Sequence, residues 1–303
     1  MTKKATTKKP KLKSLRVATC QFAVEGNVAH NRRWILDQME QGAAQGADII
    51  HFSEAALSGY LGVDLPDIEA LDWDQLQAAT RDVMAQAKRL GVWVLLGSAH
   101  RLDDQTKPHN CVYVINSRGQ IVDRYDKRFC TGQGGKRPTL DLCHYTAGNR
   151  PVTFRIRGIT CGIGICYDYR FPELFRELKR LRVEILFQSF HNARSSVVAD
   201  PKYNIWRTIV PATMQCRAAE NHFWVSANNS TTRPSQWASF TVRPDGLITG
   251  RLTLHRPGVL ITDMPLDPAC FDAPALWRES AMRQTLHSGT LVDHPRTRDV
   301  TSL

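Results

Sequence analysis

The 303-residue chain lacks several features that mark well-known protein classes. No apolar run approaches the ~18 uninterrupted residues of a membrane-spanning helix. The chain has no HExxH motif and no CxxC pair, and its ten histidines do not cluster with the spacing of metal ligands. It also has no Pro-, Gly- or Ser-rich linker and no internal repeat. We therefore expect no membrane span, no metal, no cofactor and one main folded domain.

Two glycine-containing segments resemble nucleotide-binding motifs, but both are incomplete. The GxG of residues 162–164 lies in an expected strand, yet the third glycine of a dinucleotide fingerprint would fall at Tyr167. The GQGGK run of residues 132–136 resembles a phosphate-binding loop. Cys130 stands in place of that loop's first glycine, and Arg137 in place of its final Ser or Thr. These departures exclude both readings.

The positive charge is unevenly placed along the chain. The formal net charge is +11, and residues 1–14 carry six lysines and no acidic residue. This segment has no apolar core of the signal-peptide type, and no basic stripe with interleaved aromatics occurs elsewhere. We expect residues 1–14 to form a solvated, disordered tail. Contact of this tail with nucleic acid or an anionic surface is the alternative, and we do not favour it.

The eight cysteines sit mostly inside apolar runs and form no dense framework. In a chain of this size, that usage is typical of reduced thiols in a cytoplasmic compartment. Most of them are expected to be small buried hydrophobes, and one is a candidate nucleophile. Hydrophobic residues make up 42% of the chain and charged residues 23%, which is enough for a sizeable core.

Hydrophobic periodicity predicts strands that alternate with helices, the pattern of an α/β fold. The expected strands cover residues 15–22, 47–52, 92–98, 110–115, 121–125, 160–165, 183–187 and 223–227, with a hairpin over 239–251. The expected helices cover residues 27–45, 73–90, 172–181 and 206–221. We read residues 15–265 as one domain. Residues 266–303 form a Pro-punctuated C-terminal extension, which we expect to pack on a neighbouring element or at a subunit interface.

Three polar residues, Glu54, Lys127 and Cys166, stand where expected strands end. Ligands and reactive groups converge at the carboxyl ends of strands in α/β sheets. Singly, each residue has a plain structural reading, because a free cysteine is usually core and a charge at a strand end is usually solvated. Their order and surroundings make the set more informative.

The residues around this set carry a family resemblance. The motifs are GADIIHFSEAALSGY at residues 46–60, DRYDKRF at 123–129 and CGIGICYDYRFPELFR at 161–176, with fitting blocks at 215–230 and 239–248. Through them the chain resembles the nitrilase, or carbon–nitrogen hydrolase, superfamily over nearly all of its core. The resemblance implies an α/β fold of the αββα four-layer sandwich type. It also implies a homodimer or larger homo-oligomer, in which a helical layer of one subunit packs on another.

The resemblance further implies Glu54 as general base, Lys127 as electrostatic stabiliser and Cys166 as nucleophile. The chemistry agrees, because a thiol with a pKa of about 8.5 is mostly protonated at neutral pH and needs a base. Lys127 and the backbone N–H of Tyr167 could stabilise a tetrahedral oxyanion. A helix that begins at Pro172 could also favour the thiolate through its dipole.

One departure from the family pattern concerns a second carboxylate. Family members usually carry a second glutamate seven residues before the glycine that closes the loop after the lysine motif. Counting back from Gly148 gives Asp141, which keeps the charge but is one methylene shorter. We predict that Asp141 takes the positioning role of that glutamate near Lys127 or the substrate.

The residue after the nucleophile bears on the substrate. True nitrilases generally have Trp there, whereas this chain has Tyr167 and resembles aliphatic amidases of the ω-amidase and deaminated-glutathione type. We therefore expect hydrolysis of a small amide, of the ω-amide or N-carbamoyl type, through a thioester. The alternatives are a catalytically silent scaffold protein and a soluble acyltransferase on the same fold.

The substrate pocket is expected to combine the first motif with the loops after two strands. A substrate carboxylate could pair with Arg194 or Arg170, because guanidinium geometry suits carboxylates. The alternative for Arg170 is a structural pair with Glu173 or another acid. The residues expected to contact substrate are Tyr60, Arg170, His191, Asn192 and Arg194.

Overall fold

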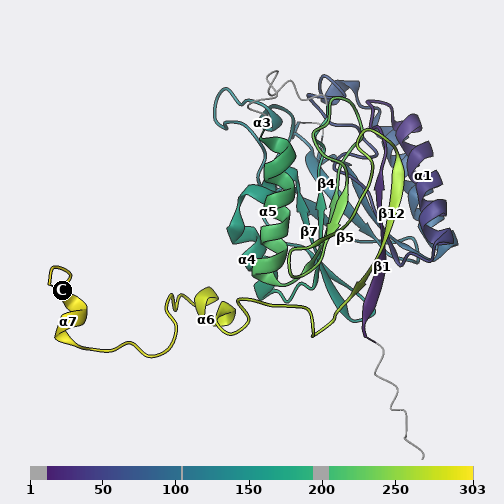
Figure 1. Cartoon of the computed structure of the whole chain (residues 1–303). Helices are drawn as coiled ribbons and strands as arrows, with labels where there is room; N and C mark the ends of the chain where they lie inside the picture. The colour runs from purple at the N-terminus through teal and green to yellow at the C-terminus, as the bar shows by residue number, and fades with distance from the viewer. Residues whose placement is uncertain (1–11, 104, 194–204, 303) are drawn as a thin grey trace, which may run out of the picture.

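The computed structural model describes residues 12–103, 105–193 and 205–302. Most of the expected basic tail and the candidate Arg194 lie outside the described residues. The described part is built on two six-stranded sheets with helices on their outer faces (Figure 1).

The first sheet has the strand order β12-β1-β2-β3-β4-β5. Its strands are β1 (Ser14–Gln21), β2 (Ile49–His51), β3 (Trp93–His100), β4 (His109–Ile115), β5 (Ile121–Asp126) and β12 (Gly258–Pro265). The second sheet has the order β11-β10-β9-β8-β7-β6. Its strands are β6 (Thr153–Ile156), β7 (Ile159–Ile165), β8 (Ile185–Ser189), β9 (Trp224–Asn228), β10 (Phe240–Val242) and β11 (Ile248–Arg251). In each sheet the three consecutive strands β1-β2-β3 or β7-β8-β9 run parallel.

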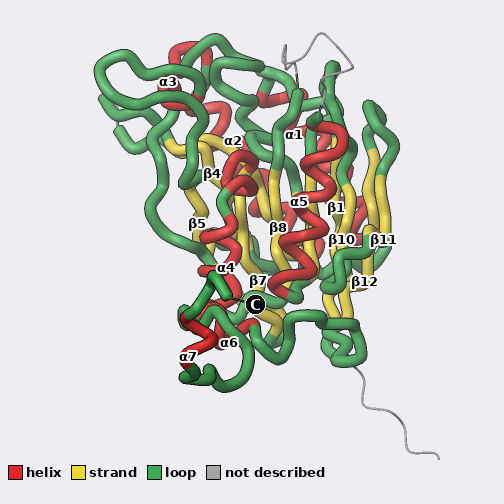
Figure 2. Tube along the Cα trace, turned by 60° about the vertical axis from the view of Figure 1, so that its left-hand side comes forward, coloured by secondary structure: helices red, strands yellow, loops and turns green. Residues whose placement is uncertain are grey.

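Four longer helices flank the sheets, and short helical turns lie in the loops (Figure 2). The longer helices are α1 (Val28–Ala44), α2 (Trp73–Leu90), α4 (Pro172–Arg180) and α5 (Trp206–Asn221). The short elements are η1 (Ile68–Ala70), α3 (Asp141–His144), η2 (Cys166–Arg170), α6 (Arg278–Met282) and α7 (Pro295–Arg298). No helix in the described ranges is both long enough and apolar enough to cross a membrane.

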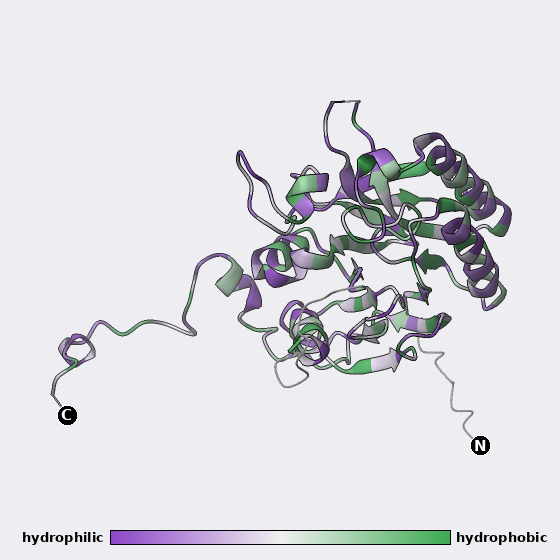
Figure 3. Ribbon diagram, turned by 90° about the horizontal axis from the view of Figure 1, so that it is seen from above, coloured by the Kyte–Doolittle hydropathy of each residue, from purple (hydrophilic) through white to green (hydrophobic). Residues whose placement is uncertain are grey.

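Three apolar clusters show how the layers stack. One cluster joins α1 and α2 to the first sheet, through residues such as Ile35 and Ile50. A second lies between the two sheets and includes Leu95 and Ile163. The third joins the second sheet to α4 and α5, around Met214. In Figure 3 the hydrophobic colour lies mainly toward the sheets and the hydrophilic colour on the outer helix faces. The expected αββα four-layer sandwich is therefore confirmed.

Local signals in the sequence explain the sharp limits of α2. Asp72 caps its start by accepting a hydrogen bond from the backbone N–H of Gln75 at 2.9 Å. Gly91 ends it in the left-handed conformation (φ 68°), where a side chain would be strained. Lys88 and Arg89 in the last turn complement the negative end of the helix dipole. The expected range of 73–90 matches the structure.

Two strands, β6 and β12, were not anticipated from the sequence. β12 lies at the edge of the first sheet and pairs antiparallel with β1, from Ser14 opposite Pro265 to Gln21 opposite Gly258. Most of its residues are half-buried, so apolar and polar positions do not alternate clearly. The pairing places the end of the domain beside its beginning.

The C-terminal extension has two parts. Its first part packs on the same chain, where the Arg278 guanidinium bonds the backbone oxygen of Glu220 and pairs with Asp272. Arg180 likewise donates to the backbone oxygen of Met282. Beyond α6 the chain runs away from the sandwich (Figures 1 and 3). A contact of this part with another subunit stays a prediction.

Candidate active site

The three strand-end residues meet at one end of the sandwich. Glu54 is the third residue after β2, Lys127 directly follows β5, and Cys166 directly follows β7 and opens η2. Glu54 and Lys127 are fully buried, whereas Cys166 is partly exposed. Tyr167, whose backbone N–H we expect at the oxyanion, is the next residue of η2. Glu54 and Lys127 come from the first sheet and Cys166 from the second, so the site spans the interface between the sheets.

Lys127 is the hub of a buried charged network. Its Nζ lies 2.8 Å from Glu54 Oε1, 2.8 Å from Asp141 Oδ2 and 3.0 Å from the hydroxyl oxygen of Tyr60. Tyr60 in turn donates its hydroxyl proton to Asp141 Oδ1 at 2.7 Å. The backbone N–H of Thr131 donates to Asp141 Oδ2 at 3.0 Å. The ammonium is thus held in place by two carboxylates and a phenol.

The two oxygens of Glu54 have different surroundings. Oε1 accepts hydrogen bonds from Lys127 Nζ and from Asn110 Nδ2, each at 2.8 Å. Oε2 is buried and has no hydrogen-bond partner among the described residues. Because Oε1 is already shared by two donors, Oε2 is the oxygen available to receive a proton.

The electrostatics of the site keep the thiol neutral and the lysine charged. Burial raises the pKa of the Cys166 thiol well above its ordinary value, and the nearby Glu54 raises it further while Lys127 lowers it in part. Burial opposes the charge on Lys127, but Glu54, Tyr60, Cys166 and Asp141 together raise its pKa well above the ordinary value. The described residues contain no group of three His, Cys, Asp or Glu side chains placed to hold a metal ion.

That the helix starting at Pro172 favours the thiolate through its dipole stays a prediction. The pKa of Cys166 is raised in the resting arrangement, because burial and the Glu54 charge outweigh the favourable charge of Lys127. The rest of η2 and Phe171 also separate Cys166 from the start of α4.

Asp141 lies where the family pattern places its second carboxylate, in contact with Lys127. Burial alone raises the pKa of Asp141, but the Lys127 charge and hydrogen bonds from Lys127, Thr131 and Tyr60 bring it below its ordinary value. Asp141 is thus ionised at neutral pH. Its role in positioning Lys127 stays a prediction.

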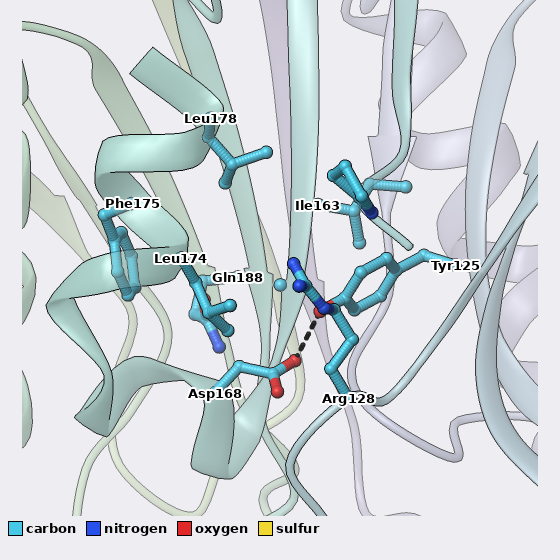
Figure 4. A pocket seen from close by; sticks show the side chains of 10 residues that line it. Tyr125, Arg128, Ile163, Asp168, Leu174, Phe175, Leu178 and Gln188 are labelled. Atoms are coloured by element: carbon cyan, nitrogen blue, oxygen red, sulfur yellow. Dashed lines mark hydrogen bonds between the residues drawn. The ribbon is translucent and has the colours of Figure 1, made fainter. Parts of the chain in front are cut away.

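The turn that carries Cys166 is conformationally constrained. Cys166 has φ 40°, a left-handed value that is rare for a residue with a side chain. The buried Asp168 holds the turn, since its Oδ2 accepts from the backbone N–H of Ile165 at 2.9 Å and from the Tyr125 hydroxyl at 2.8 Å (Figure 4). Its Oδ1 accepts from the backbone N–H of Phe129 at 2.9 Å. Asp168 therefore ties the turn that carries Cys166 to the chain just after Lys127.

His191 lies beside this cluster, on the ring of Tyr60. The two rings are stacked, with centroids 5.2 Å apart and an interplanar angle of 19°. His191 Nε2 lies 3.0 Å from Asp64 Oδ2, and both side chains are fully buried. Tyr60 itself is buried and has its hydroxyl engaged with Lys127 and Asp141. Two of the residues expected to contact substrate are thus next to the charged network.

The other expected substrate contacts are less directly placed. The Asn192 side-chain oxygen accepts from the backbone N–H of Gln236 at 2.9 Å, which orders the loop after β8. The guanidinium of Arg170 lies over two rings, 4.9 Å from the centroid of Tyr169 and 4.7 Å from that of Trp206. This stacking is the contact that the structure gives Arg170, in place of the expected structural pair with Glu173.

Sequence reasoning missed Asn110 and Asp168. Asn110 lies near the start of β4, which runs antiparallel to β5, so it sits beside the end of β5 that carries Lys127. The backbone N–H of Lys127 donates to the backbone oxygen of Asn110 at 2.8 Å. A lone amide at the start of the apolar run NCVYVI was the available signal. Asp168 lies in the CYDYRFPE run. No pattern there distinguishes a buried carboxylate that holds a turn from an acidic residue at the surface.

Comparisons with known proteins identify the family of the chain. A family model described as "Carbon-nitrogen hydrolase" matches residues 16–269. Deaminated glutathione amidase of Mus musculus is 27% identical over 268 residues, which cover 82% of this chain and 77% of the relative. The 2-oxoglutaramate amidase of Bacillus subtilis is 27% identical over 186 residues, covering 61% of this chain and 64% of the relative.

A solved structure shares the fold. An amidase of the nitrilase superfamily from Nesterenkonia AN1 superposes with a TM-score of 0.70 at 20% sequence identity. The superposition covers 91% of this chain and 99% of the amidase. At this identity the likeness supports the four-layer fold and not the substrate.

Proposed function

Because this chain belongs to the carbon–nitrogen hydrolase family and is an enzyme that acts on amides, we propose that its substrate is a small ω-amide that carries a carboxylate. Two similar proteins are named for amides, deaminated glutathione and 2-oxoglutaramate, and the second of these is a carboxylate-bearing ω-amide. The CYDYRFPE run supports the same class. N-carbamoyl compounds are the nearest alternative substrates.

In the proposed first half-reaction, Cys166 attacks the amide carbon. Glu54 Oε2 takes the thiol proton as the sulfur–carbon bond forms, because the raised pKa of Cys166 prevents prior ionisation. Lys127 Nζ and the backbone N–H of Tyr167 stabilise the oxyanion. When the carbon–nitrogen bond breaks, Glu54 returns the proton to the nitrogen, which leaves as ammonia.

The second half-reaction hydrolyses the thioester on Cys166. Water enters, Glu54 takes one of its protons, and the resulting hydroxide adds to the carbonyl carbon. Collapse of this second tetrahedral intermediate breaks the carbon–sulfur bond. The proton on Glu54 passes to the sulfur, the acid leaves, and the starting state is restored.

One observation carries this mechanism more than any other. Glu54 is anchored through Oε1 by Lys127 and Asn110, while Oε2 stays without a partner in the described part of the chain. An anchored carboxylate with one free oxygen can shuttle a proton without reorienting between the half-reactions. Asp141 and Tyr60 hold the Lys127 ammonium beside Glu54.

We propose that the remaining candidates shape the substrate site. His191 and Tyr60 form one wall, Asn192 orders the loop after β8, and Arg170 offers a cation to the substrate carboxylate. Arg194, outside the described residues, is the second candidate cation. Guanidinium groups suit carboxylates because they can bond both oxygens at once.

The test is ammonia release from a panel of ω-amides, simple aliphatic amides, N-carbamoyl compounds and nitriles. Cys166→Ala should abolish release, whereas Cys143→Ala, at an exposed thiol, should leave it unchanged. The best substrate should carry a carboxylate, and its methyl ester should have a higher KM. A preferred substrate without a carboxylate would overturn the proposed substrate class.

Two further outcomes separate the alternative functions. A product that partitions toward an added amine, with little free acid, would indicate the acyltransferase. No turnover of any compound, together with failure of an electrophile to label Cys166 in an intact-mass measurement, would indicate the silent scaffold. The intact arrangement of Glu54, Lys127 and Cys166 argues for hydrolysis.

We also propose that the chain forms a homodimer or larger homo-oligomer, with the C-terminal extension at a subunit interface. Beyond α6 four large apolar side chains are 71–90% exposed: Leu286, Leu291, Val292 and Val300. Exposed apolar residues on an extended segment favour burial against a partner. Removing residues 284–303 should lower the number of subunits per particle, calculated from the mass that light scattering measures. An unchanged number of subunits would contradict this role.

We propose a reducing, cytoplasmic location, on the basis of the cysteines. All eight cysteines are free in the structure, as is typical of proteins in reducing compartments. Fractionation with an antibody against the chain would test this proposal. Recovery of the protein from an oxidising compartment would contradict it.

A further inference from the structure

A line of hydrogen bonds crosses between the two sheets behind the active site. His51 Nδ1 lies 2.8 Å from Ser226 Oγ, and His51 Nε2 lies 3.0 Å from Ser189 Oγ. Ser226 Oγ also lies 2.7 Å from Thr19 Oγ1, and Ser189 Oγ donates to the backbone oxygen of Phe52 at 3.3 Å. All five residues are fully buried. The line passes from β1 to β9, back to β2, and on to β8.

One assignment of the protons satisfies every group in this line. Ser189 has a single hydroxyl proton and gives it to Phe52, so its oxygen accepts from His51 Nε2–H. His51 Nδ1 is then the acceptor and receives the hydroxyl proton of Ser226. The Ser226 oxygen accepts in turn from Thr19. His51 is therefore assigned as the neutral Nε2–H tautomer.

The surroundings of His51 keep this arrangement constant with pH. Burial lowers the pKa of His51 to about 3, so the ring stays neutral at neutral and mildly acidic pH. The ring meets Phe187 edge-on, with centroids 5.2 Å apart. Asn228 Nδ2 donates to the backbone oxygen of His51 at 2.6 Å and adds another bond between the sheets. No charged partner faces the ring in these contacts.

The line ends where the catalytic residues begin. His51 is the last residue of β2, and Glu54 follows three positions later. Ser189 is the last residue of β8, and the next residue, Phe190, accepts the backbone N–H of Glu54 at 3.3 Å. β8 is also the parallel neighbour of β7, the strand that leads into Cys166. The bonds of His51 thus connect the strand of the base to the sheet of the nucleophile.

We propose that His51 is a positioning residue that sets the distance between Glu54 and Cys166 across the two sheets. The proposal rests on the proposed amidase mechanism, because that mechanism passes a proton between Cys166 and Glu54. It assigns their spacing to the hydrogen bonds of His51. Apolar packing is not directional and allows small shifts, whereas hydrogen bonds to both ring nitrogens fix the offset. A misplacement of about 1 Å in an active site can cost ~100-fold in rate.

The experiment compares His51→Phe with His51→Gln on the best amide of the panel. Phe keeps a flat ring but makes neither bond, whereas Gln can still donate an amide N–H toward Ser189. We expect His51→Phe to lower kcat by about 10- to 100-fold while KM changes by less than about threefold. His51→Gln should recover most of kcat. The proposal would be overturned if His51→Phe and His51→Gln lowered kcat by the same factor and changed KM by the same factor.

A second measurement does not depend on turnover. The pH midpoint of Cys166 labelling by iodoacetamide, followed by intact mass against a Cys166→Ala background, reports the pKa of the thiol. Because Glu54 raises this pKa, Glu54→Gln should lower the midpoint in the otherwise wild-type chain. In the His51→Phe background the same change should have a smaller effect, since the carboxylate is no longer held against the thiol. Equal shifts in both backgrounds would contradict the positioning role.

Controls separate this role from a general loss of packing. His100 at the end of β3 is also partly buried, and its Nδ1 lies 2.8 Å from the Tyr113 hydroxyl, far from Glu54 in sequence. His100→Phe should leave kcat and the labelling midpoint unchanged. If His51→Phe does not fold, Ser226→Ala removes the donor to Nδ1 together with the acceptor of Thr19 but keeps the bond from Nε2 to Ser189, and it should produce a smaller loss of the same kind. If the wild type hydrolyses no amide, the proposed function fails, and the labelling comparison still decides the role of His51.

Discussion

Two buried polar regions of this protein lie close together and differ in kind. We call the first the charged cluster, made of Glu54, Lys127, Asp141 and Tyr60. We call the second the neutral line, made of Thr19, Ser226, His51 and Ser189. The charged cluster lies in the first sheet and its loops, whereas the neutral line passes between the sheets four times if the bond to Phe52 is included.

The difference shows how the work of an active site is divided. In the charged cluster each ion is stabilised by the others, so that the loss of one leaves an uncompensated charge in a dry place. In the neutral line each group exchanges one hydrogen bond with the next, and the loss of one leaves only an unpaired dipole. In the proposed mechanism the first region supplies the charge and the proton shuttle, and the second supplies alignment. Mutations should therefore affect the two regions by different amounts.

The largest effect is expected from Lys127→Met. This change leaves Glu54 and Asp141 buried without their cation, which should cost about 3–5 kcal/mol of unfolding free energy. Turnover should fall by about 1,000-fold or more, because the oxyanion loses its charged donor. Urea denaturation and ammonia release measure the two effects. Lys107→Met, which removes a lysine whose Nζ bonds the backbone oxygen of Leu142, should have a small effect on both. Equal destabilisation by Lys127→Met and Lys107→Met would contradict the expected cost of leaving Glu54 and Asp141 without their cation.

The next effect concerns the base. Glu54→Gln should slow turnover by about 100- to 10,000-fold, because no group remains to carry the proton. The same change should lower the pKa of the Cys166 thiol, since the carboxylate charge raises it in the wild type. In Glu54→Gln the thiol should therefore ionise more easily while turnover becomes slower. Faster turnover along with a lower thiol pKa would show that the resting thiolate, and not the shuttle, limits the reaction.

A smaller effect is expected at the second carboxylate. The pKa of Asp141 is lowered in the fold, so its contribution to stability is present above its ordinary pKa of about 3.9 and is lost as the pH falls through the lower folded value. Wild-type stability should therefore drop more steeply below about pH 4 than that of Asp141→Asn. At pH 7 the variant should be less stable by about 1–3 kcal/mol. Urea titrations at several pH values measure both differences.

The role of Asp141 in catalysis has its own outcome. Asp141→Asn should reduce turnover by about tenfold, because Lys127 keeps a neutral acceptor but loses one ionic partner. Asp141→Ala should reduce it further. Full turnover in both variants would end the prediction that this aspartate replaces the second family glutamate.

The smallest effect is expected in the neutral line. Thr19→Val keeps the shape but removes the first hydroxyl, which should cost about 1 kcal/mol of unfolding free energy and less than threefold in kcat. Thr80→Val, which removes a hydroxyl bonded to the backbone oxygen of Leu76 on the surface side of α2, serves as the matched control. A loss in Thr19→Val as large as that in Lys127→Met would erase the distinction between the two regions.

Much of the charged cluster could be anticipated from the sequence. Glu54, Lys127 and Cys166 each follow an expected strand, and the motifs around them are specific enough to give the family. Asp141 required only counting back from Gly148. Asn110 could not be anticipated in the same way, because an amide in an apolar strand becomes a contact of Glu54 only once β4 is paired beside β5.

The neutral line was invisible in the sequence for a related reason. His51 stands inside the short apolar run ADIIHF, where a lone histidine is most simply a polar interruption of a strand. Its partners Ser226 and Ser189 lie 175 and 138 residues away, on strands of the other sheet. Likewise, the edge strand β12 lacks alternation, so that its pairing with β1 gave no periodic signal.

The sequence by itself therefore determined the family and the alternation of strands and helices, and it singled out Glu54, Lys127 and Cys166 as the proposed base, stabiliser and nucleophile. These depend on short motifs and on local periodicity, which are properties of neighbouring residues. Only the tertiary structure decided which oxygen of Glu54 is free, that burial raises the pKa of the thiol, and that His51 connects the sheets. Desolvation and hydrogen-bond partners depend on residues far apart in the chain, and no local pattern records them.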